Sequence, residues 1–335
     1  MIQALLERGV AEGVFPLARV EVFHEGRHVI SAGNASPSCV FDLASVTKVM
    51  STTALVLDTK LPLDARVRDF FSTARVDAAI ADLLFHRSGL PAFIPFFATP
   101  GVRVLDGVLA AEPQHHGQAV YSDLGFILLG AILEKFTATP LDELFASRVA
   151  RPLGLAAGYR RLSKHLALPP DFARTGDTRP REPAPGQEGL WNVPVQPTAL
   201  AEVDDDNAYV MDGVSGHAGL FANALDVARF GQAVLEGRFA PPTPWKADDR
   251  TPGSTRALGF DTPAREGASC GPRFGRGPRG AIGHLGFTGT SVWIDLDRRL
   301  VVALLTNRVA LGRANVRIRE FRPRLHDAVL DVLGL

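Results

Sequence analysis

A serine and a lysine three residues apart, Ser45 and Lys48, have the residue types of a nucleophile and its base. Residues 49–58 are typical of a helix, and residues three apart on a helix share one face. A serine hydroxyl attacks efficiently only when a base takes its proton, and a lysine is such a base only when its amine is neutral. Because burial and the positive end of a helix dipole both lower the pKa of a lysine, the spacing predicts acyl transfer through Ser45. The alternative is a capping serine followed by a solvated lysine.

Two other stretches could complete such a site. Tyr121 precedes an apolar helix predicted over 122–135, and its phenol could relay a proton to and from a neutral lysine. His284-Leu285-Gly286 is expected to open a C-terminal strand, where the glycine lets a substrate approach the backbone. The N–H groups of Ser45 and Phe287 would then form an oxyanion hole. The alternatives are a tyrosine packed at a helix start and a histidine that closes a loop.

The elements that must position these residues are strands at both ends of the chain and helices between them. Such an order predicts an α+β fold, an antiparallel sheet built from both termini and flanked by helices, with a helical lobe inserted. We expect residues 1–60 and 207–335 to form the sheet lobe, residues 61–206 the helical lobe, and the site to lie between them. Strands are predicted over 18–24, 27–33, 286–295 and 300–306, helices over 77–86, 102–111, 122–135, 140–150, 225–236 and 321–333, and an irregular excursion over 156–206.

The composition narrows the class of protein. Lys+Arg and Asp+Glu both number 36 among 335 residues, so no net charge favours nucleic acid or an anionic membrane. Cys39 and Cys270 are too few for a disulfide framework. No uncharged apolar stretch of about 18 residues predicts a membrane span. The first residues indicate an amphipathic helix and no signal peptide, so we expect a cytoplasmic protein, or a periplasmic one if a leader has been removed. The oligomeric state stays open.

Five blocks in a fixed order carry a resemblance to a known family. They are Phe41–Lys48, Leu83–Pro91, Tyr121–Phe126, Gly213–Phe221 and Gly283–Thr290. Together they resemble the serine β-lactamase-related family, which holds class C β-lactamases, D-alanyl-D-alanine carboxypeptidases and esterase relatives. The resemblance covers nearly the whole chain and implies the β-lactamase/transpeptidase-like fold, an α/β sandwich.

The resemblance also implies a role for each candidate residue. Ser45 corresponds to the acylated nucleophile, Lys48 to the base beside it, and Tyr121 to the proton shuttle that opens the Tyr-x-Asn motif. His284-Leu285-Gly286 takes the place of the Lys-Thr-Gly strand and would bind substrate. No cofactor and no metal are implied, and the expected partner is a small-molecule or short-peptide substrate.

Two departures from the family pattern bear on the substrate. Asp123 stands where the family has asparagine, and an ionised carboxylate cannot donate a hydrogen bond to a substrate carbonyl. Asp123 could also pair with Lys48 and keep it charged. His284 replaces a lysine that meets the substrate carboxylate, so both changes weaken the case for β-lactam hydrolysis. The loop that carries Arg273, Arg276 and Arg279 either supplies cationic contacts in its place or is simply solvated.

Two other patterns do not indicate a site. His115-His116, His217 and Asp204-Asp205-Asp206 lack the ligand spacing of a metal centre. Gly275–Gly280 fits G-x-G-x-x-G but follows no predicted strand and opens no helix.

The sequence therefore predicts a serine hydrolase that acts through an acyl-enzyme on an ester or on a peptide-type or lactam amide. An esterase or D-Ala-D-Ala-peptidase-like activity ranks above a true class C-like β-lactamase. The alternative from another class is a catalytically silent protein that binds a peptidoglycan-like ligand.

Overall fold

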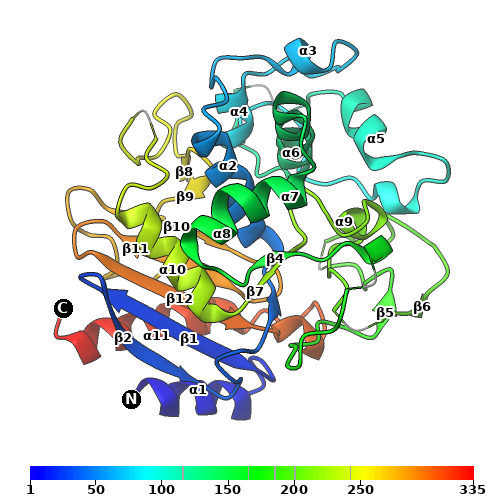
Figure 1. The fold of residues 1–335 in the computed structure, drawn as a ribbon. Helices are drawn as coiled ribbons and strands as arrows, with labels where there is room; N and C mark the ends of the chain where they lie inside the picture. Colours follow the sequence, from blue (N-terminus) through cyan, green and yellow to red (C-terminus); the bar gives the residue numbers. More distant parts are fainter. Residues whose placement is uncertain (115–116, 165, 185, 200, 242) are drawn as a thin grey trace.

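A seven-stranded antiparallel sheet joins the two ends of the chain in the computed structural model, which describes residues 1–335 apart from 115–116, 165, 185, 200 and 242 (Figure 1). The strand order is β2-β1-β12-β11-β10-β9-β8, so the N-terminal hairpin pairs directly with the last strand. The strands are β1 (Ala18–His24), β2 (Arg27–Gly33), β8 (Arg256–Ala257), β9 (Phe260–Asp261), β10 (Ala281–Leu285), β11 (Ser291–Asp295) and β12 (Leu300–Thr306). The predicted α+β fold with an antiparallel sheet from both termini is confirmed.

β12 shows why the sheet is covered on both faces. All seven of its residues are buried, as expected of a continuous apolar run, and alternate side chains point to opposite faces. Val302 packs into the core beneath α1 and α11, and Val301 packs into the larger core beneath α10. Figure 1 shows α10 on one face of the sheet and α1 with α11 on the other, close to both termini.

The helical part of the chain lies above this sheet in Figure 1, around α6. α6 is apolar on nearly all sides, and its buried residues belong to the larger core, as the sequence predicts for a core helix. Ser122 caps it by accepting a hydrogen bond from the N–H of Gly125. The α-helices are α1 (Ile2–Ala11), α2 (Ala54–Asp58), α3 (Val67–Phe70), α4 (Ile80–Leu84), α5 (Val104–Ala110), α6 (Asp123–Thr137), α7 (Leu141–Phe145), α8 (Arg151–Leu153), α9 (Asp206–Val210), α10 (Ala224–Leu235) and α11 (Ile318–Leu333).

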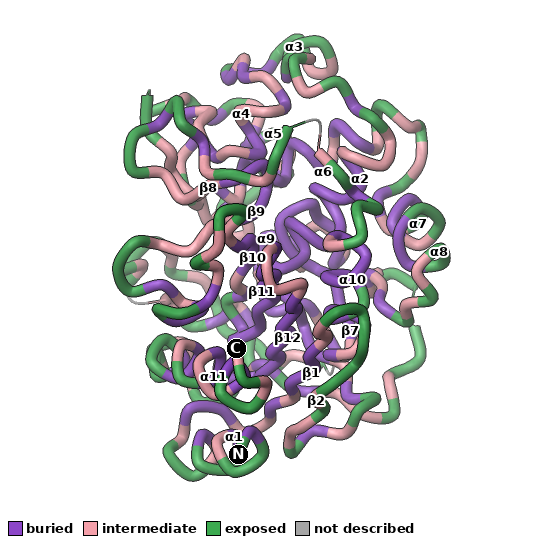
Figure 2. The backbone as a smooth tube through the Cα atoms, turned by 90° about the vertical axis from the view of Figure 1, so that its left-hand side faces the viewer, coloured by how far each residue is buried: buried purple, intermediate pink, exposed green. Residues whose placement is uncertain are grey.

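The segment that follows Ser45 is helical but not one regular α-helix. It runs through a 3₁₀ turn, η1 (Ala44–Val46), and a π-helical stretch, η2 (Lys48–Thr53), before α2 begins. Every residue of η2 is buried, so the segment passes through the interior of the molecule (Figure 2). π-Helical turns occur often at functional sites, and this one carries Lys48.

A small three-stranded sheet holds the chain just before Ser45. β3 (Phe41–Asp42) pairs with β7 (Leu220–Ala222), which also pairs with β4 (Gly158–Tyr159). This sheet brings the 41–48 and 213–221 blocks side by side, although they lie far apart in the sequence.

One predicted strand has different bounds. The sequence suggested a strand over 286–295, but the structure has β10 over 281–285, a turn over 286–290, and β11 over 291–295. Gly289 adopts φ +105, which ends the extended run. His284 therefore lies near the end of a strand, and the expectation that it opens one was wrong.

The remaining stretches give little regular structure. Residues 156–206 hold β4, a 3₁₀ turn at Leu162–Lys164 and two more two-residue strands, β5 (Thr178–Arg179) and β6 (Gln196–Pro197). The division into two lobes stays a prediction. Among the described residues no single helix is long and apolar enough to cross a membrane, and the one pair that passes together, α6 with Leu141–Leu153, is bent by 78°.

Candidate active site

The nucleophile and base predicted from the sequence lie in direct contact. Nζ of Lys48 is 2.9 Å from Oγ of Ser45 and 3.1 Å from the carbonyl oxygen of His217. Lys48 has no exposed surface, whereas Ser45 opens to solvent beside it. Ala44, just before the serine, holds φ +46, and its N–H donates to Oδ1 of Asp42 at 2.7 Å. A positive φ is uncommon for alanine, so a strained residue immediately precedes Ser45.

Asp123 also contacts the lysine. Its Oδ1 lies 2.7 Å from Nζ of Lys48, which is the pairing that the sequence raised as a possibility. Burial alone would lower the pKa of Lys48, but the Asp123 carboxylate and the Tyr121 phenol outweigh it, and the pKa is raised from 10.5. The resting lysine is therefore an ammonium ion, which is one of the two states that the sequence left open.

Tyr121 lies over the same group. Nζ of Lys48 is 4.9 Å from the centroid of its ring. Burial raises the pKa of Tyr121, while Lys48 and Ser45 act in the opposite direction, and the net shift is upward. The phenol is therefore neutral at pH 7 and can pass a proton without carrying a charge. His86 packs on the ring at 4.6 Å between centroids, and its Nδ1 accepts the N–H of Ser122, which fixes the loop that carries Tyr121.

His284 lies on the other side of Tyr121, at 5.9 Å between ring centroids. Its Nδ1 is 2.8 Å from the carbonyl oxygen of Leu285, so Nδ1 carries the proton. Burial, followed by the charges of Lys48 and Arg256, holds the pKa of His284 well below its usual range. The ring is therefore neutral, with a lone pair on a buried Nε2 that has no hydrogen-bond partner among the described residues. It does not replace the positive charge of the family lysine.

Gly286 explains the last position of the His-x-Gly motif. A Cβ there would lie 2.5 Å from the carbonyl oxygen of Leu43 and would collide with Oγ1 of Thr290. Only glycine therefore lets the turn after β10 approach the chain that leads into Ser45.

Hydrogen bonds fasten this turn to the nucleophile segment. Oγ1 of Thr288 donates to the carbonyl oxygen of Asp42 at 2.8 Å, and Oγ1 of Thr290 donates to that of Leu43 at 2.9 Å. Phe287 immediately precedes Thr288 and lines both pockets that reach Ser45. The oxyanion hole formed by the N–H groups of Ser45 and Phe287 stays a prediction, and this arrangement supports it.

Two pockets of opposite character meet at Ser45, Tyr121 and Phe287. The first, which we call the acidic pocket, has a volume of about 150 Å³. The second, the arginine pocket, has a volume of about 310 Å³. The acidic pocket is lined further by Ala44, Phe93, Phe97, Asp123, Ala184, Gln187, Trp191, Asp204, Asp205, Asp206, His217, Ala218 and Arg313. The arginine pocket is lined further by Arg256, Asp261, His284, Leu285, Gly286, Arg308, Val316, Ile318, Arg319 and Arg322.

The loop that carries Arg273, Arg276 and Arg279 follows the second of the two alternatives, a loop away from the site. Arg273 pairs with Asp331, Arg276 bonds to the carbonyl oxygen of Pro272, and Arg279 lies 3.7 Å from Asp297. None of the three lines either pocket at Ser45. The arginines that do so are Arg256 from β8, Arg308 from η6 (Arg308–Leu311), and Arg319 and Arg322 from α11.

His217 and Asp205 were set aside from the sequence, yet they lie at the site. Nε2 of His217 is 3.0 Å from Oδ1 of Asp205, and one ligand atom from each lies within 4.8 Å of a carboxylate oxygen of Asp123. Each of these three side chains already has an ionic or hydrogen-bonding partner, in Lys48, His217 or Ser215, which accounts for the arrangement. The pair His115-His116 lies outside the described residues.

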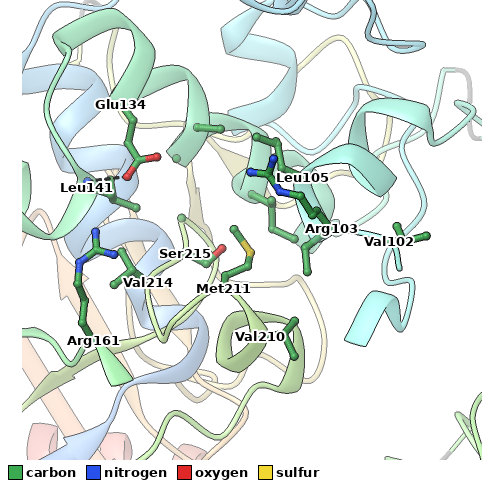
Figure 3. Close-up of a pocket in the computed structure, with 15 residues that line it drawn as sticks. Val102, Arg103, Leu105, Glu134, Leu141, Arg161, Val210, Met211, Val214 and Ser215 are labelled. Carbon is green, nitrogen blue, oxygen red and sulfur yellow. Dashed lines mark hydrogen bonds between the residues drawn. The ribbon is translucent and has the colours of Figure 1, made fainter. Parts of the chain in front are cut away.

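A third cavity of about 450 Å³ lies elsewhere (Figure 3). Glu134 and Arg161 point toward it from one side, and Leu105 and Arg103 border it on another. It shares no lining residue with the two pockets at Ser45. It is therefore separate from the candidate chemistry.

Comparisons with known proteins agree with this geometry. The β-lactamase family model matches residues 2–322. An N-acetylmuramyl-L-alanine amidase of Bacillus subtilis (strain 168) is 31% identical, covering 92% of this chain and 80% of the relative. A putative D-alanyl-D-alanine carboxypeptidase of Salmonella agona is 29% identical, covering 85% of this chain and 73% of the relative.

Solved structures share the fold at lower identity. A D-amino acid amidase from Ochrobactrum anthropi superposes with a TM-score of 0.70 at 21% identity over 99% of both chains. EstCE1, a hydrolase with promiscuous acyltransferase activity, gives 0.67 at 20% identity over 96% of this chain and 97% of its own. A class C β-lactamase from Rhodobacter sphaeroides gives 0.63 at 19% over 99% of both chains. The chain belongs to the β-lactamase family and is a serine hydrolase of that family.

Proposed function

We propose that this hydrolase cleaves an ester or a peptide-type amide through an acyl-enzyme on Ser45, in the manner of a peptidase or esterase rather than a true β-lactamase. The observation that carries the proposal is the 2.9 Å contact between Nζ of Lys48 and Oγ of Ser45, at the place where two pockets meet. One pocket can take the acyl part of a substrate and the other its leaving group.

The reaction follows from these contacts. Lys48 must first lose a proton; its neutral amine, with Tyr121 as partner, then takes the proton of Ser45 as Oγ bonds to the carbonyl carbon. The N–H groups of Ser45 and Phe287 hold the resulting oxyanion. The proton passes on to the leaving nitrogen or oxygen as its bond to the carbonyl carbon breaks. Water then adds to the acyl-enzyme, returns a proton to Oγ, and releases the acid.

The arginine pocket favours a substrate with an anionic group. Arg319 is exposed at its edge, and Arg322 is buried with an Nε that has no hydrogen-bond partner among the described residues. A guanidinium matches a carboxylate in shape and charge. A peptide that ends in a free carboxylate, as the carboxypeptidase relatives suggest, would place that group here.

Asp123 and His284 rank β-lactam hydrolysis lower. The carboxylate of Asp123 is engaged with Lys48, so it donates no hydrogen bond to a substrate amide. His284 is neutral and brings no cation to the carboxylate of a β-lactam.

The test is a panel of p-nitrophenyl esters, D-Ala-D-Ala peptides and nitrocefin, with the wild type, Ser45→Ala and the exposed-serine control Ser38→Ala. We expect Ser45→Ala to lose at least about a thousandfold in kcat on every substrate that the wild type turns over, because the nucleophile is gone. Intact mass after treatment with a fluorophosphonate should show one adduct in the wild type and in Ser38→Ala and none in Ser45→Ala. Absence of an adduct on folded wild-type protein would support the binding-protein alternative.

A further inference from the structure

The acidic pocket contains two carboxylates with a free oxygen each. Oδ1 of Asp123 is paired with Lys48, and Oδ1 of Asp205 takes hydrogen bonds from the N–H of Ala208 and from His217. Among the described residues, no hydrogen bond or ion pair reaches Oδ2 of either aspartate. Both side chains keep partial exposure, 19% and 25%, and both line the pocket that contains Ser45.

The two aspartates that follow and precede Asp205 each have an arginine within ion-pair distance, whereas Asp205 has His217. Asp204 pairs with Arg181 at 3.1 Å and with Arg313 at 2.9 Å. Asp206 pairs with Arg179 at 2.9 Å. Among the described residues the ion-pair partner of Asp205 is His217, and the guanidinium of Arg313 acts on it from beyond ion-pair distance.

His217 bridges Asp205 and Ser215 by hydrogen bonds. Nε2–H of His217 donates to Asp205, and the hydroxyl of Ser215, 2.8 Å from Nδ1, can donate to the ring. Burial would raise the pKa of Asp205, but His217 and the N–H of Ala208 outweigh it and hold the pKa below its usual range. Asp205 is therefore ionised at pH 7 and presents its carboxylate to the pocket.

Aromatic rings form another part of the lining. Phe97 meets Trp191 edge-on at 5.1 Å between centroids, and Phe93 meets it at 6.3 Å. All three rings line the acidic pocket. Aromatic rings beside a carboxylate stabilise an organic cation, because the ring faces are electron-rich and the site is partly dry.

We propose that the acidic pocket binds a free ammonium group on the acyl part of the substrate, one carbon from the scissile carbonyl, with Asp205 and Asp123 as its partners. The inference rests on the proposed acyl transfer through Ser45. Asp123 contacts Lys48 and Lys48 contacts Ser45, so the carboxylate lies within two hydrogen-bond lengths of the nucleophile. An α-ammonium on a carbonyl at Ser45 lies within that reach. The substrate class is an N-terminally free amino acid amide, ester or short peptide.

This ammonium would also activate the base. Asp123 holds Lys48 charged at rest, and a second cation beside Asp123 competes for the carboxylate and repels the lysine. Binding therefore lowers the pKa of Lys48, and the proton leaves to solvent before Ser45 attacks. The same substrate without its charge leaves the lysine protonated.

The test compares alanine p-nitroanilide, in both enantiomers, with its N-acetyl derivative. We expect kcat/KM to be at least about tenfold higher for the free amine. The pH at which its rate rises as Lys48 loses its proton should lie at least about one unit lower. Asp205→Asn keeps a hydrogen-bond acceptor at the cap of α9 but removes the charge. It should lower kcat/KM about tenfold for the free amine and less than twofold for the acetylated substrate. Glu188→Gln, an exposed change in the neighbouring loop, should alter neither.

If the protein hydrolyses neither anilide, a binding measurement tests the proposal instead. Calorimetry with the wild type should show that glycinamide binds at pH 7 at least about tenfold more tightly than N-acetylglycinamide, and that Asp205→Asn removes the difference. Equal binding, or equal losses on both substrates, would overturn the ammonium proposal. Failure of the proposed function itself would look different, since Ser45 would take no fluorophosphonate and p-nitrophenyl acetate would not be hydrolysed.

Discussion

The ion pair between Lys48 and Asp123, with Nζ 2.7 Å from Oδ1, determines the protonation state of the resting site. A fully buried lysine without a partner would tend toward the neutral form. Here the carboxylate raises the pKa, so the site rests in an inactive protonation state that substrate binding must change.

Replacing Asp123 by asparagine should therefore release the base. Without the carboxylate, burial dominates and the pKa of Lys48 falls. The rise of the hydrolysis rate with pH, measured with a neutral p-nitrophenyl ester, should therefore move to lower pH. The amide can also donate to a substrate carbonyl, so nitrocefin turnover should rise several-fold. Asp106→Asn, an exposed change on α5, is the matched control. An unchanged pH profile and unchanged nitrocefin rate in Asp123→Asn would show that the pair does not control the base.

Gly286→Ala should lower the catalytic rate more than it lowers the stability of the fold. Its Cβ would push the turn after β10 away from Leu43 and move the N–H of Phe287 relative to Ser45. We expect kcat to fall about a hundredfold, the loss typical of one oxyanion donor. Gly158→Ala is the control, because a Cβ there meets nothing within 4 Å. Wild-type kcat in Gly286→Ala would remove Phe287 from the oxyanion hole.

Arg319→Ala tests the arginine pocket. The side chain is exposed, so its contact with a substrate carboxylate is screened by solvent, and we expect KM for an ester with a free carboxylate to rise about two- to fivefold. KM for the matching methyl ester should not change. Arg276→Ala, on the loop outside the site, should affect neither substrate. An equal change in KM for both esters would show that the arginine pocket does not bind the substrate carboxylate.

His326 makes the fold acid-sensitive. Burial, with the charge of Arg322, lowers its pKa from 6.5 to about 3. Below pH 6.5, His326 is therefore protonated in the unfolded chain but stays neutral in the folded chain. Stability is lost as the pH falls from 6.5 toward 3. Between pH 7.5 and 5.5 this group should lower the unfolding free energy by about 1.4 kcal/mol.

Urea unfolding at the two pH values checks this. His326→Leu should show a pH-dependent loss smaller by about that amount than the wild type. His24→Leu on β1 should keep the wild-type difference. An equal loss in His326→Leu and wild type would assign the acid sensitivity to other groups.

The residues that could be predicted are those whose chemistry is local in the sequence. Ser45 and Lys48 share a helical segment, and that spacing alone brings their polar atoms together. Tyr121 follows from its place before the apolar helix α6 and from the family pattern. The strands at both ends follow from their alternation and turns, so β1, β2 and β12 were predicted with their bounds. The short strands β8 and β9 were missed, and one predicted run over 286–295 stands where β11 and the turn after β10 lie.

The rest depends on contacts that no local pattern records. Asp205 and His217 meet because α9 and the strand β7 both pack near Lys48, and a single sequence gives no path for the irregular stretch before α9. The arginine pocket gathers side chains from β8, η6 and α11. Each looks like an ordinary surface residue until the sheet brings the three elements to one place.

The two threonine bonds that fasten the turn after β10 span 246 and 247 residues of sequence. Loop closure over such a distance comes late in folding, after the sheet has joined the two ends of the chain. A chain that ends before this turn already contains Ser45, Lys48 and Tyr121 but lacks Phe287 and both threonines. We therefore expect a chain truncated before this turn to lack hydrolysis, although it contains the nucleophile and its base.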